Sequence, residues 1–362
     1  MKIVKLELED KSYPIVITKD DFKNLAKRLK ALSLGNEAFI ISNPLISRLY
    51  AKSLQAELLS SGINSTVYNI KDSESSKSIA QYIKTITKIS SIDTKKCLFC
   101  IALGGGVVGD LTGFVAATYK RGIPYVQVPT TLLSQVDSAI GGKTAIDLAS
   151  GKNLVGAFFQ PKLVYSNVSL LKSLAKRQIS SGLAEVVKYG MIIDKNLFSF
   201  LEKNHEKIMK LDKDCLIRII GTASKIKAQI VANDEKETKG LRTILNFGHT
   251  IGHALETATD YSNLNHGEAI SIGMVAACEI SEEIGILQSG VKEKLIDLLT
   301  KFNLPIKAKK IDLKKVYKAF YRDKKFINGK IRVVIPSRIG HVMVTEDIPF
   351  NIIKKVIQRS VK

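Results

Sequence analysis

The stretch that decides the fold is CLFCIALGGGVVGD, residues 97–110. Its first half, residues 97–103, is a continuous apolar run, which is typical of a strand buried on both faces of a parallel sheet. Three consecutive glycines follow, and residues 111–119 beyond them have helical character. A strand, a glycine-rich turn and a helix in this order predict a βα unit of a nucleotide-type α/β domain.

The glycines Gly104, Gly106 and Gly109 fit the pattern GxGxxG. In such a turn the backbone can approach a pyrophosphate closely, and the helix N-terminus offers it free N–H groups. A tight strand-to-helix turn without a ligand is the alternative, because the motif alone is weakly specific. The motif begins at residue 104, whereas an ordinary dinucleotide-binding fold carries it after the first strand. We therefore expect a variant nucleotide-binding domain.

Segments on either side extend the α/β pattern. Short apolar runs predict strands at residues 38–42, 64–70, 125–128 and 163–165, with a helix at 79–89. After about residue 168 helical periodicity dominates, at 174–191, 196–210, 215–231, 250–259, 267–284, 292–302, 313–320 and 352–361, with a small strand at 331–335. We expect an α/β fold with two domains: a nucleotide-binding α/β domain with a mostly parallel sheet (residues 1–168) and a mainly α-helical domain (residues 169–362).

The composition is that of a globular protein with a basic excess. The chain has 362 residues, 45% of them apolar, and a formal net charge of +21. Such a charge invites a nucleic-acid or membrane-surface interpretation. Residues 301–362 carry 17 basic and 4 acidic side chains, but they match no nucleic-acid-binding module. We interpret the lysines at 307–318 as a solvated helix face and expect no nucleic-acid partner.

The sequence also argues against a membrane or secreted protein. No stretch reaches the roughly 18 uncharged apolar residues of a membrane span, and residues 1–11 alternate apolar and charged side chains, unlike a signal peptide. We expect a first strand there, no membrane partner and a cytoplasmic location. Cys97 and Cys100 form a CxxC without a second pair at zinc-ribbon spacing. We interpret both as buried apolar residues and expect no disulfide.

Three of the five histidines fall within eighteen positions, which favours a metal site. His249 and His253 lie one helical turn apart in HTIGH, and His266 follows in HGE. HTIGH lacks the glutamate of the zinc-protease motif HExxH. A pair of histidines at this spacing is also ordinary on a helix, but a third beside a glutamate favours metal binding.

Glu185 and Lys188 lie at i, i+3 on one face of a predicted helix. A surface ion pair is the alternative, but the small and apolar residues on both sides indicate a largely buried helix. A buried carboxylate needs a partner such as a metal, and one Glu with two His leaves an open position on zinc, as in catalytic sites. Several cations near glycines suit a small substrate that carries phosphate and carboxylate.

With these residues the chain resembles the 3-dehydroquinate synthase family of sugar phosphate cyclases. The resemblance covers nearly the whole chain and is densest over residues 97–275. The matching stretches are GGGVVGDLTGF (104–114), RGIPYVQVPTTLLSQVDSAIGGKTAID (121–147), GKNLVGAFFQP (151–161), GLAEVVKYG (182–190), LRTILNFGHTIGHALE (241–256) and HGEAISIGM (266–274).

The resemblance implies an NAD- and metal-dependent carbon–oxygen lyase of the shikimate pathway. Such enzymes convert 3-deoxy-D-arabino-heptulosonate 7-phosphate into 3-dehydroquinate and phosphate by transient oxidation, phosphate elimination, re-reduction and an intramolecular aldol closure. The cofactors implied are NAD and one divalent metal ion, zinc or cobalt. The partners implied are this sugar acid phosphate and a second copy of the chain in a homodimer.

The resemblance also implies site residues. It makes Glu185, His249 and His266 the metal ligands, and it gives catalytic roles to Lys188, Glu237, Asn246 and His253, the last as a general base or proton relay. The NAD-binding residues would be Asp72, Glu74, Lys77, Gly105, Gly106, Asp110, Thr130, Thr131, Lys143, Lys152, Leu170 and Ser173. The substrate would meet Arg121, donated across the dimer interface, and Asp137, Asn153, Lys188, Lys227, Arg242 and one of Lys324 and Lys325.

At two positions the chain differs from the pattern of the family, and both concern binding of the adenosine half of NAD. Ser73 stands where many relatives have glycine, and a serine lacks the freedom of glycine at positive φ. Asn43 stands where several relatives have Asp, so it could hydrogen-bond a ribose hydroxyl only without charge.

Three alternatives remain. Another sugar phosphate cyclase would act on a substrate without a carboxylate and would leave buried cations such as Arg242 unpaired. A metal-dependent polyol dehydrogenase would accumulate NADH and would need no phosphate-binding set. A basic nucleic-acid-binding protein would leave Glu185, His249 and His266 unexplained.

Overall fold

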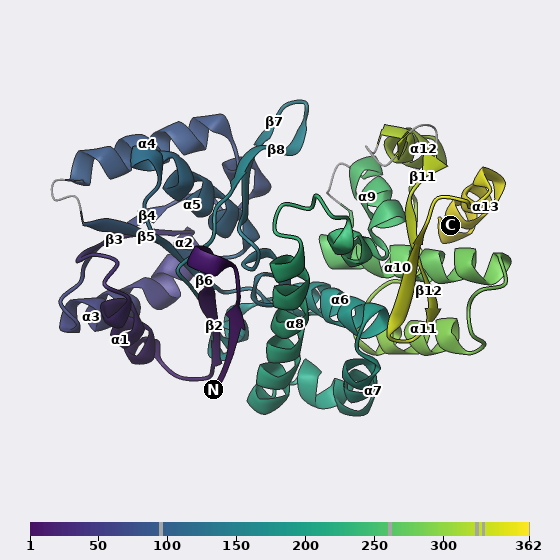
Figure 1. Ribbon diagram of the computed structural model, residues 1–362, viewed down its shortest axis with the longest axis horizontal. Helices are drawn as coiled ribbons and strands as arrows, with labels where there is room; N and C mark the ends of the chain where they lie inside the picture. The colour runs from purple at the N-terminus through teal and green to yellow at the C-terminus, as the bar shows by residue number, and fades with distance from the viewer. Residues whose placement is uncertain (94–96, 260–262, 323–325, 328–329, 362) are drawn as a thin grey trace. The chain divides into compact units, whose positions relative to one another are not determined.

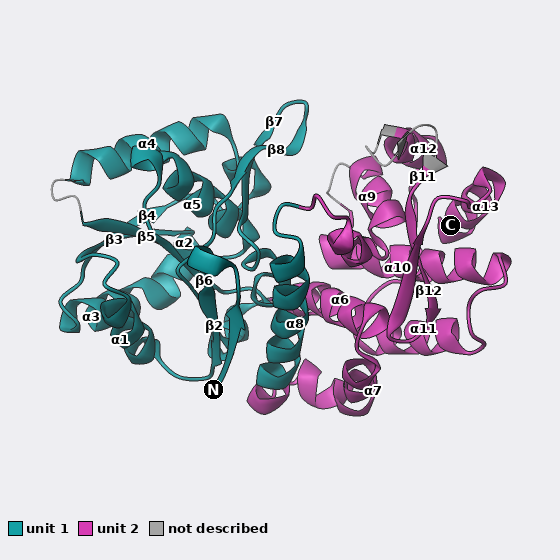
Figure 2. Ribbon diagram, in the orientation of Figure 1, with its two compact units in different colours: residues 1–174, 216–236 teal, residues 175–215, 237–362 magenta. Residues whose placement is uncertain are grey.

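The computed structural model describes residues 1–93, 97–259, 263–322, 326–327 and 330–361 (Figure 1). The chain forms two compact units: unit 1 comprises residues 1–174 and 216–236, and unit 2 comprises residues 175–215 and 237–362 (Figure 2). Unit 1 is α/β and unit 2 is mainly helical. The domain boundary expected at residues 168 and 169 stays a prediction, and unit 1 also includes most of α8 (Lys213–Asn233).

A seven-stranded sheet organises unit 1 in the order β1-β2-β9-β6-β5-β3-β4. Its strands are β1 (Lys2–Leu6), β2 (Tyr13–Thr18), β3 (Glu37–Ser42), β4 (Asn64–Asn69), β5 (Leu98–Gly104), β6 (Tyr125–Pro129) and β9 (Leu163–Asn167). Only the β1–β2 pairing in this sheet is antiparallel. The mostly parallel sheet predicted from the sequence is confirmed, and β5, the strand of the opening stretch, lies inside it and is buried throughout.

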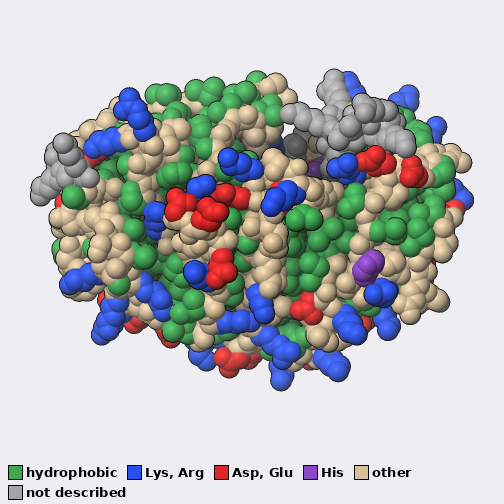
Figure 3. Space-filling model, in the orientation of Figure 1, with side chains coloured by type: hydrophobic (Ala, Val, Ile, Leu, Met, Phe, Trp, Pro, Cys, Tyr) green, Lys and Arg blue, Asp and Glu red, His purple; other side chains and the backbone are tan. Residues whose placement is uncertain are grey.

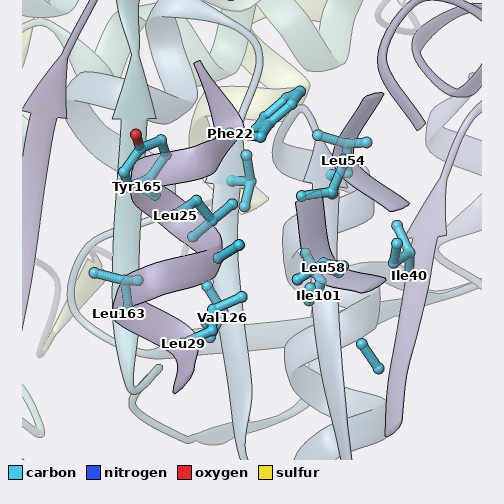
Figure 4. Packing of buried hydrophobic residues seen from close by; sticks show 14 of the residues in the cluster. Phe22, Leu25, Leu29, Ile40, Leu54, Leu58, Ile101, Val126, Leu163 and Tyr165 are labelled. Atoms are coloured by element: carbon cyan, nitrogen blue, oxygen red, sulfur yellow. The ribbon is translucent and has the colours of Figure 1, made fainter. Parts of the chain in front are cut away.

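Helices cover both faces of the sheet because its inner strands are apolar on both sides. In β5, Phe99 and Ile101 join the core cluster under α1 (Phe22–Leu32) and α3 (Lys52–Ser60). Leu98 and Cys100 point the other way, into the cluster under α4 (Ile79–Ile92) and α5 (Gly106–Thr118). Figure 4 shows the first cluster, in which leucines of α1 and α3 face Ile101 and Val126 of the sheet.

Unit 1 also contains a hairpin outside the main sheet and several short helical segments. A separate antiparallel hairpin, β7 (Lys143–Leu148) and β8 (Gly151–Phe158), packs against α5. The shorter helical segments are η1 (Glu9–Lys11), α2 (Pro44–Ile46), η2 (Ser47–Ala51), η3 (Glu74–Ser76), η4 (Tyr119–Arg121), η5 (Ser134–Ser138) and η6 (Val168–Ser173).

Unit 2 is built around the buried helix α10 (His266–Glu283). α10 packs against α6 (Lys176–Ile192), α9 (His249–Ala258), α11 (Val291–Lys301), α13 (Phe350–Ser360) and β12 (Val333–Arg338). The other elements are α7 (Lys195–Met209), η7 (Leu241–Asn246), α12 (Leu313–Arg322), β10 (Phe326–Ile327), β11 (Lys330–Ile331) and β13 (His341–Thr345). Because α10 packs against these five elements, they fix its position and with it the position of the residues in its first turn.

Every helix predicted from periodicity is present, with ends shifted by a few residues. Among the longer elements, β2, α1, α3, β13 and the β7–β8 hairpin were not predicted from the sequence. The hairpin is rich in glycine and small polar residues and is partly exposed, so it lacks the apolar signal of the buried strands. The cysteine prediction is half wrong: Cys100 is buried in β5, but Cys97 precedes the strand and is exposed. All four cysteines are free.

Much of the basic excess lies in residues 301–362, but it is not confined to them. Figure 3 shows Lys and Arg side chains dispersed over the face in view. On α12, Lys314, Lys315 and Lys318 are exposed while Val316 and Phe320 are buried, which confirms the predicted solvated helix face for these three lysines. Lys307, Lys309 and Lys310 precede α12, so for them the prediction of a helix face is wrong. Within the described part of the chain, no helix combines the length and apolar character needed to cross a membrane.

Adjacent leucines on α3 provide a test of the core. Leu58 is fully buried in the cluster of Figure 4, whereas Leu59 is 64% exposed. We expect Leu58→Ala to lower the free energy of unfolding by about 2–5 kcal/mol, because it leaves a cavity. Leu59→Ala should change it by no more than about 0.5 kcal/mol. Urea unfolding of both variants, followed by circular dichroism, checks this, and equal losses would contradict the packing.

Candidate functional site

Three donor side chains from three helices converge in unit 2. Glu185 comes from the middle of α6, and His249 and His266 are the first residues of α9 and α10. The Nε2 atom of each imidazole lies 3.5 Å from Oε1 of Glu185. One donor atom from each residue can be chosen so that all lie within 4.8 Å of one another. The set that the resemblance implies for metal binding is therefore brought together.

The two oxygens of Glu185 have different neighbours. Oε2 is held by Nζ of Lys188, one turn further along α6, whereas Oε1 faces both imidazoles. Glu185 is fully buried and Lys188 is nearly so. The donor set of one carboxylate oxygen and two imidazole nitrogens suits zinc or cobalt, and three protein ligands leave a position for another ligand. The residues present thus fit a catalytic divalent metal ion.

The charges around the cluster affect the two imidazoles in opposite ways. Burial, reinforced by the positive charge of Lys188, lowers the pKa of His249 well below its usual value. Burial also disfavours the protonated form of His266, but hydrogen bonds with Glu185 and Glu256 outweigh it and raise the pKa of His266 to about 10. Two carboxylates that favour a proton on this ring also favour a bound cation beside it.

A ladder of contacts between α6 and the first turn of α10 fixes the distance from Glu185 to His266. Arg177 pairs with both carboxylate oxygens of Glu268 at 2.6 Å. One turn later, Oγ of Ser181 accepts a hydrogen bond from the backbone N–H of Gly267 at 3.0 Å. One further turn brings Glu185 to His266. Successive turns of α6 thus meet residues 268, 267 and 266.

The start of α10 is itself well defined. Asn265 is its N-cap: its side chain accepts a hydrogen bond from the Glu268 backbone N–H, and the Glu268 carboxylate accepts one from the Asn265 backbone N–H, which completes a capping box. Gly267 is required because a Cβ there would lie 2.2 Å from the carbonyl oxygen of Ser181. On the other side, a Cβ at Gly273 would lie 1.9 Å from the carbonyl oxygen of Gly248, so α9 and α10 also approach closely.

Further predicted residues of unit 2 lie on η7 and beside the cluster. Arg242 is buried, and its Nε atom lies 3.1 Å from a carboxylate oxygen of Glu237, which has a left-handed φ of 58°. Asn246 is the last residue of η7. The His253 ring lies 5.1 Å from the His249 ring, and its side chain is 44% exposed, so it can exchange protons with a bound molecule or water. The predicted Lys324 and Lys325 lie outside the described residues.

The glycine-rich turn of unit 1 has the predicted form. β5 ends at Gly104, Gly105 is the N-cap and α5 begins at Gly106. A Cβ at Gly105 would lie 3.0 Å from the Thr131 side chain, and the Thr130 backbone N–H donates to the Gly104 carbonyl. The first N–H groups of α5 have no partner within the helix, and Gly105 and Gly106 add no side chains of their own, which suits a pyrophosphate.

An ion-pair network follows this turn. Nζ of the buried Lys77 donates to Asp110 at 2.8 Å and also to Asn153. Glu74 lies near both Lys77 and Lys152, at 3.7 and 3.4 Å. Burial raises the pKa of the Asp110 carboxyl to about 6, even though Lys77 favours its ionised form. The network joins η3, α5 and the β7–β8 hairpin.

Five of the predicted residues line one cavity of unit 1. The cavity has a volume of about 520 Å³, and its polar lining includes Asp110, Asp137, Lys143, Asn153 and Lys227. Lys227, on α8, donates to both a carboxylate oxygen and the carbonyl of Asp137, at 2.7 and 2.8 Å. The cavity can therefore offer cations, an amide and carboxylates to a polar ligand.

Other predicted residues of unit 1 lie apart from that cavity. Leu170 and Ser173 are in η6, where the Ser173 hydroxyl donates to the Leu170 carbonyl. Asp72 is exposed, and so is Arg121, which has a left-handed φ of 65° in η4. Ser73 does not need the conformational freedom of glycine, because its φ of −160° is extended backbone that any residue adopts. Asn43 caps α2 by accepting from the Ile46 backbone N–H.

Glu256, Ser181 and Arg177 were not predicted from the sequence, and Glu268 was noted only as the glutamate beside His266. Glu256 lies on α9, with Oε1 3.2 Å from Nδ1 of His266 and Oε2 4.0 Å from Nε2 of His253. Its spacing of three and seven residues from His253 and His249 places it on the same helix face, which is a signal in the sequence. The α6–α10 contacts carry no such signal, because they join segments more than 80 residues apart.

Comparisons with known proteins agree with this geometry. Residues 67–181 match the 3-dehydroquinate synthase N-terminal family, and residues 182–326 match the corresponding C-terminal family. A 3-dehydroquinate synthase from Thermodesulfovibrio yellowstonii is 46% identical over 358 residues, which cover 99% of each chain.

Two solved structures share the fold. A 2-deoxy-scyllo-inosose synthase, complexed with carbaglucose-6-phosphate, NAD⁺ and Co²⁺, superposes with a TM-score of 0.89 and 22% identity, covering 99% of this chain and 100% of the other. The 2-epi-5-epi-valiolone synthase of Streptomyces hygroscopicus, with NAD⁺ and Zn²⁺ bound, has a TM-score of 0.88 and 24% identity over 98% of both chains.

The fold is thus that of the sugar phosphate cyclases. Within this class, the two matching family regions and the full-length relative decide the assignment. The chain belongs to the 3-dehydroquinate synthase family and is an enzyme of that type.

Gly267 offers a test of the ladder between α6 and α10. We expect Gly267→Ala to lower the free energy of unfolding by about 1–3 kcal/mol, because the new methyl group would overlap the Ser181 backbone. Gly151→Ala is the control, since its Cβ would meet only the flexible Leu154 side chain, and it should cost no more than about 0.5 kcal/mol. Denaturant unfolding compares the two variants. An unchanged free energy of unfolding in Gly267→Ala would contradict the close approach of α6 and α10.

Proposed function

We propose that the chain converts 3-deoxy-D-arabino-heptulosonate 7-phosphate into 3-dehydroquinate and phosphate, with NAD⁺ as a catalytic cofactor and one divalent metal ion. The observation that carries the proposal is the convergence of Glu185, His249 and His266 in a chain that matches a 3-dehydroquinate synthase over its whole length. The same fold in two cyclases solved with NAD⁺ and with Co²⁺ or Zn²⁺ supports the choice of cofactors.

Glu185, His249 and His266 would hold the metal ion, and the glycine-rich turn with Asp110, Thr130 and Thr131 would hold NAD⁺. The bound NAD⁺ supplies a reversible hydride acceptor, and the metal ion supplies a Lewis acid. Asp72, Glu74, Lys77, Lys143, Lys152, Leu170 and Ser173 complete the proposed NAD-binding set. The free N–H groups at the start of α5 and the cations Lys77 and Lys152 suit the negative charge of a pyrophosphate.

Lys188 orients the metal-binding carboxylate. Its ammonium holds Oε2 of Glu185, which leaves Oε1 directed at the two imidazoles. Lys188 also balances the negative charge of a carboxylate that would be costly to bury alone. We assign it a second contact, with the substrate.

His253 is the residue best suited to move a proton in unit 2. It is partly exposed and lies beside the cluster, so a substrate that reaches His249 and His266 would also reach its ring. General acid–base catalysis by a histidine requires this access. We assign the supporting roles of acid/base and hydrogen-bonding partner to Glu237 and Asn246.

Fixed cations would bind the anionic groups of the substrate. The buried guanidinium of Arg242 is held by Glu237, and Lys227 is held by Asp137, so both present their remaining donors in set directions. Preorganised cations of this kind suit a phosphate and a carboxylate. We include Asp137 and Asn153 in the substrate-binding set, and also Arg121 from the partner in a homodimer. We include the homodimer and a cytoplasmic location in the proposal, because the family resemblance implies them.

Phosphate release with no lasting NADH is the signature of the proposed reaction. We expect the purified protein with NAD⁺ and Co²⁺ or Zn²⁺ to release phosphate from the heptulosonate phosphate, while NADH absorbance does not accumulate, because the hydride returns within each turnover. Steady accumulation of NADH would favour a polyol dehydrogenase. Turnover only of a sugar phosphate without a carboxylate would favour another cyclase.

Removal of one proposed ligand should remove metal and activity together. We expect His249→Ala to lose its bound metal, measured by elemental analysis after gel filtration, and to lower kcat by at least about 100-fold, since the loss of Lewis-acid stabilisation costs several kcal/mol. His205→Ala is the matched control, because His205 lies on α7, outside the cluster, and its Nδ1 lies 3.0 Å from the Glu202 carbonyl of its own helix. Full metal content in His249→Ala would refute the ligand assignment.

A further inference from the structure

We propose that Glu256 is a positioning residue of the metal centre: its carboxylate holds the Nδ1–H of His266 and so directs Nε2 of that ring toward Glu185. This inference rests on the proposed metal site and extends it to a residue on α9 that is not itself a ligand. Glu256 is buried, and its two oxygens face different histidines.

The distances define the orientation of His266. Nδ1 lies 3.2 Å from Oε1 of Glu256, within reach of a hydrogen bond, and Nε2 lies 3.5 Å from Oε1 of Glu185. A neutral imidazole carries one N–H and one lone pair. With the proton on Nδ1 facing Glu256, the lone pair of Nε2 faces the metal position, which is the arrangement that a ligand needs.

The other imidazole of the set is oriented in the same way by a different acceptor. Nδ1 of His249 lies 3.1 Å from the carbonyl oxygen of Phe247, while its Nε2 faces Glu185. Both rings therefore have an acceptor at Nδ1 and present Nε2. The carbonyl at His249 comes from the chain immediately before α9, whereas the acceptor at His266 comes from a side chain on another helix. Only the latter can be removed by substitution.

A second metal ion held by His253, Glu256 and His266 is the competing interpretation, because these three residues also bring donor atoms within 4.8 Å. It would use Nδ1 of His266, and the first ion would use Nε2. A neutral imidazole cannot donate a lone pair from both nitrogens. The set around Glu185 is also the more buried of the two. The geometry therefore favours one ion, with Glu256 hydrogen-bonded to its ligand His266.

A pair of conservative substitutions separates position from charge. Glu256→Gln keeps the reach of the side chain and an acceptor oxygen but removes the charge. Glu256→Asp keeps the charge but withdraws it by about 1.5 Å, one carbon–carbon bond. Glu279→Gln is the control, since Glu279 lies on α10 thirteen residues after His266, about 20 Å along the helix.

The measurement is the affinity of each metal-free protein for Co²⁺, obtained by competition with a chromophoric chelator, with the number of ions bound per chain. We expect Glu256→Ala and Glu256→Asp to bind Co²⁺ about 10–100-fold more weakly than the wild type. Glu256→Gln should retain most of the affinity, the control should be unchanged, and one ion should bind per chain. Far-ultraviolet circular dichroism verifies folding, and if the alanine variant does not fold, the Gln and Asp variants decide.

Several results would overturn the inference. Wild-type affinity in both Glu256→Ala and Glu256→Asp would show that the carboxylate does not position His266. Weak binding by the Gln variant with normal binding by the Asp variant would show a charge effect instead. Two ions per chain, one of them lost in Glu256→Ala, would make Glu256 a ligand of a second site.

His266→Ala separates failure of this inference from failure of the proposed function. If His266→Ala loses Co²⁺ while Glu256→Ala and Glu256→Asp bind it normally, the metal site stands and only the role of Glu256 is wrong. If His266→Ala binds Co²⁺ as the wild type does, the ligand assignment itself is wrong, and the positioning role falls with it.

Discussion

The burial of the Glu185 carboxylate is the constraint on which the functional half of this protein depends. An isolated carboxylate in the core of a helical unit would cost several kcal/mol unless it is compensated. Lys188 compensates one oxygen, and two imidazoles face the other. The partners of the carboxylate must stay in place, because a buried charge in a low-dielectric interior tolerates little displacement of the groups that compensate it.

That requirement explains the packing of α6, α9 and α10. The three helices carry one donor each, so their separations set the geometry of the cluster. Gly267 and Gly273 permit close backbone approach on two sides of α10, and the hydrogen bonds of Arg177 and Ser181 fix its first turn against α6. Glu256 then adds control over the rotation of a single ring. The site is thus held at three levels: helix separation, helix register and side-chain orientation.

Unit 1 has a different proposed role, which is to bind a large anionic cofactor mainly through backbone N–H groups. Its sheet is buried on both faces, and the glycine turn follows β5, an inner strand, at the carboxyl end of the parallel strands. The N–H groups at the start of α5 act without side chains, so glycine is needed there. Lys77, directly after η3, and Lys152, on the β7–β8 hairpin, add positive charge around this turn. Lys77 is buried and donates to Asp110 and Asn153, and Lys152 lies 3.4 Å from Glu74.

The sequence by itself determined the glycine turn, the parallel sheet and the helical second half, because apolar periodicity and local spacing are properties of short segments. Spacing also singled out Glu185 and three histidines, and the family resemblance implied which of them, Glu185, His249 and His266, are the donors. Only the tertiary structure decided which residues support those donors. Glu256 reaches His266 from another helix, and Ser181 and Arg177 meet residues 267 and 268 across more than 80 positions of chain. Such contacts follow from how helices pack, and packing depends on the whole core rather than on any one segment.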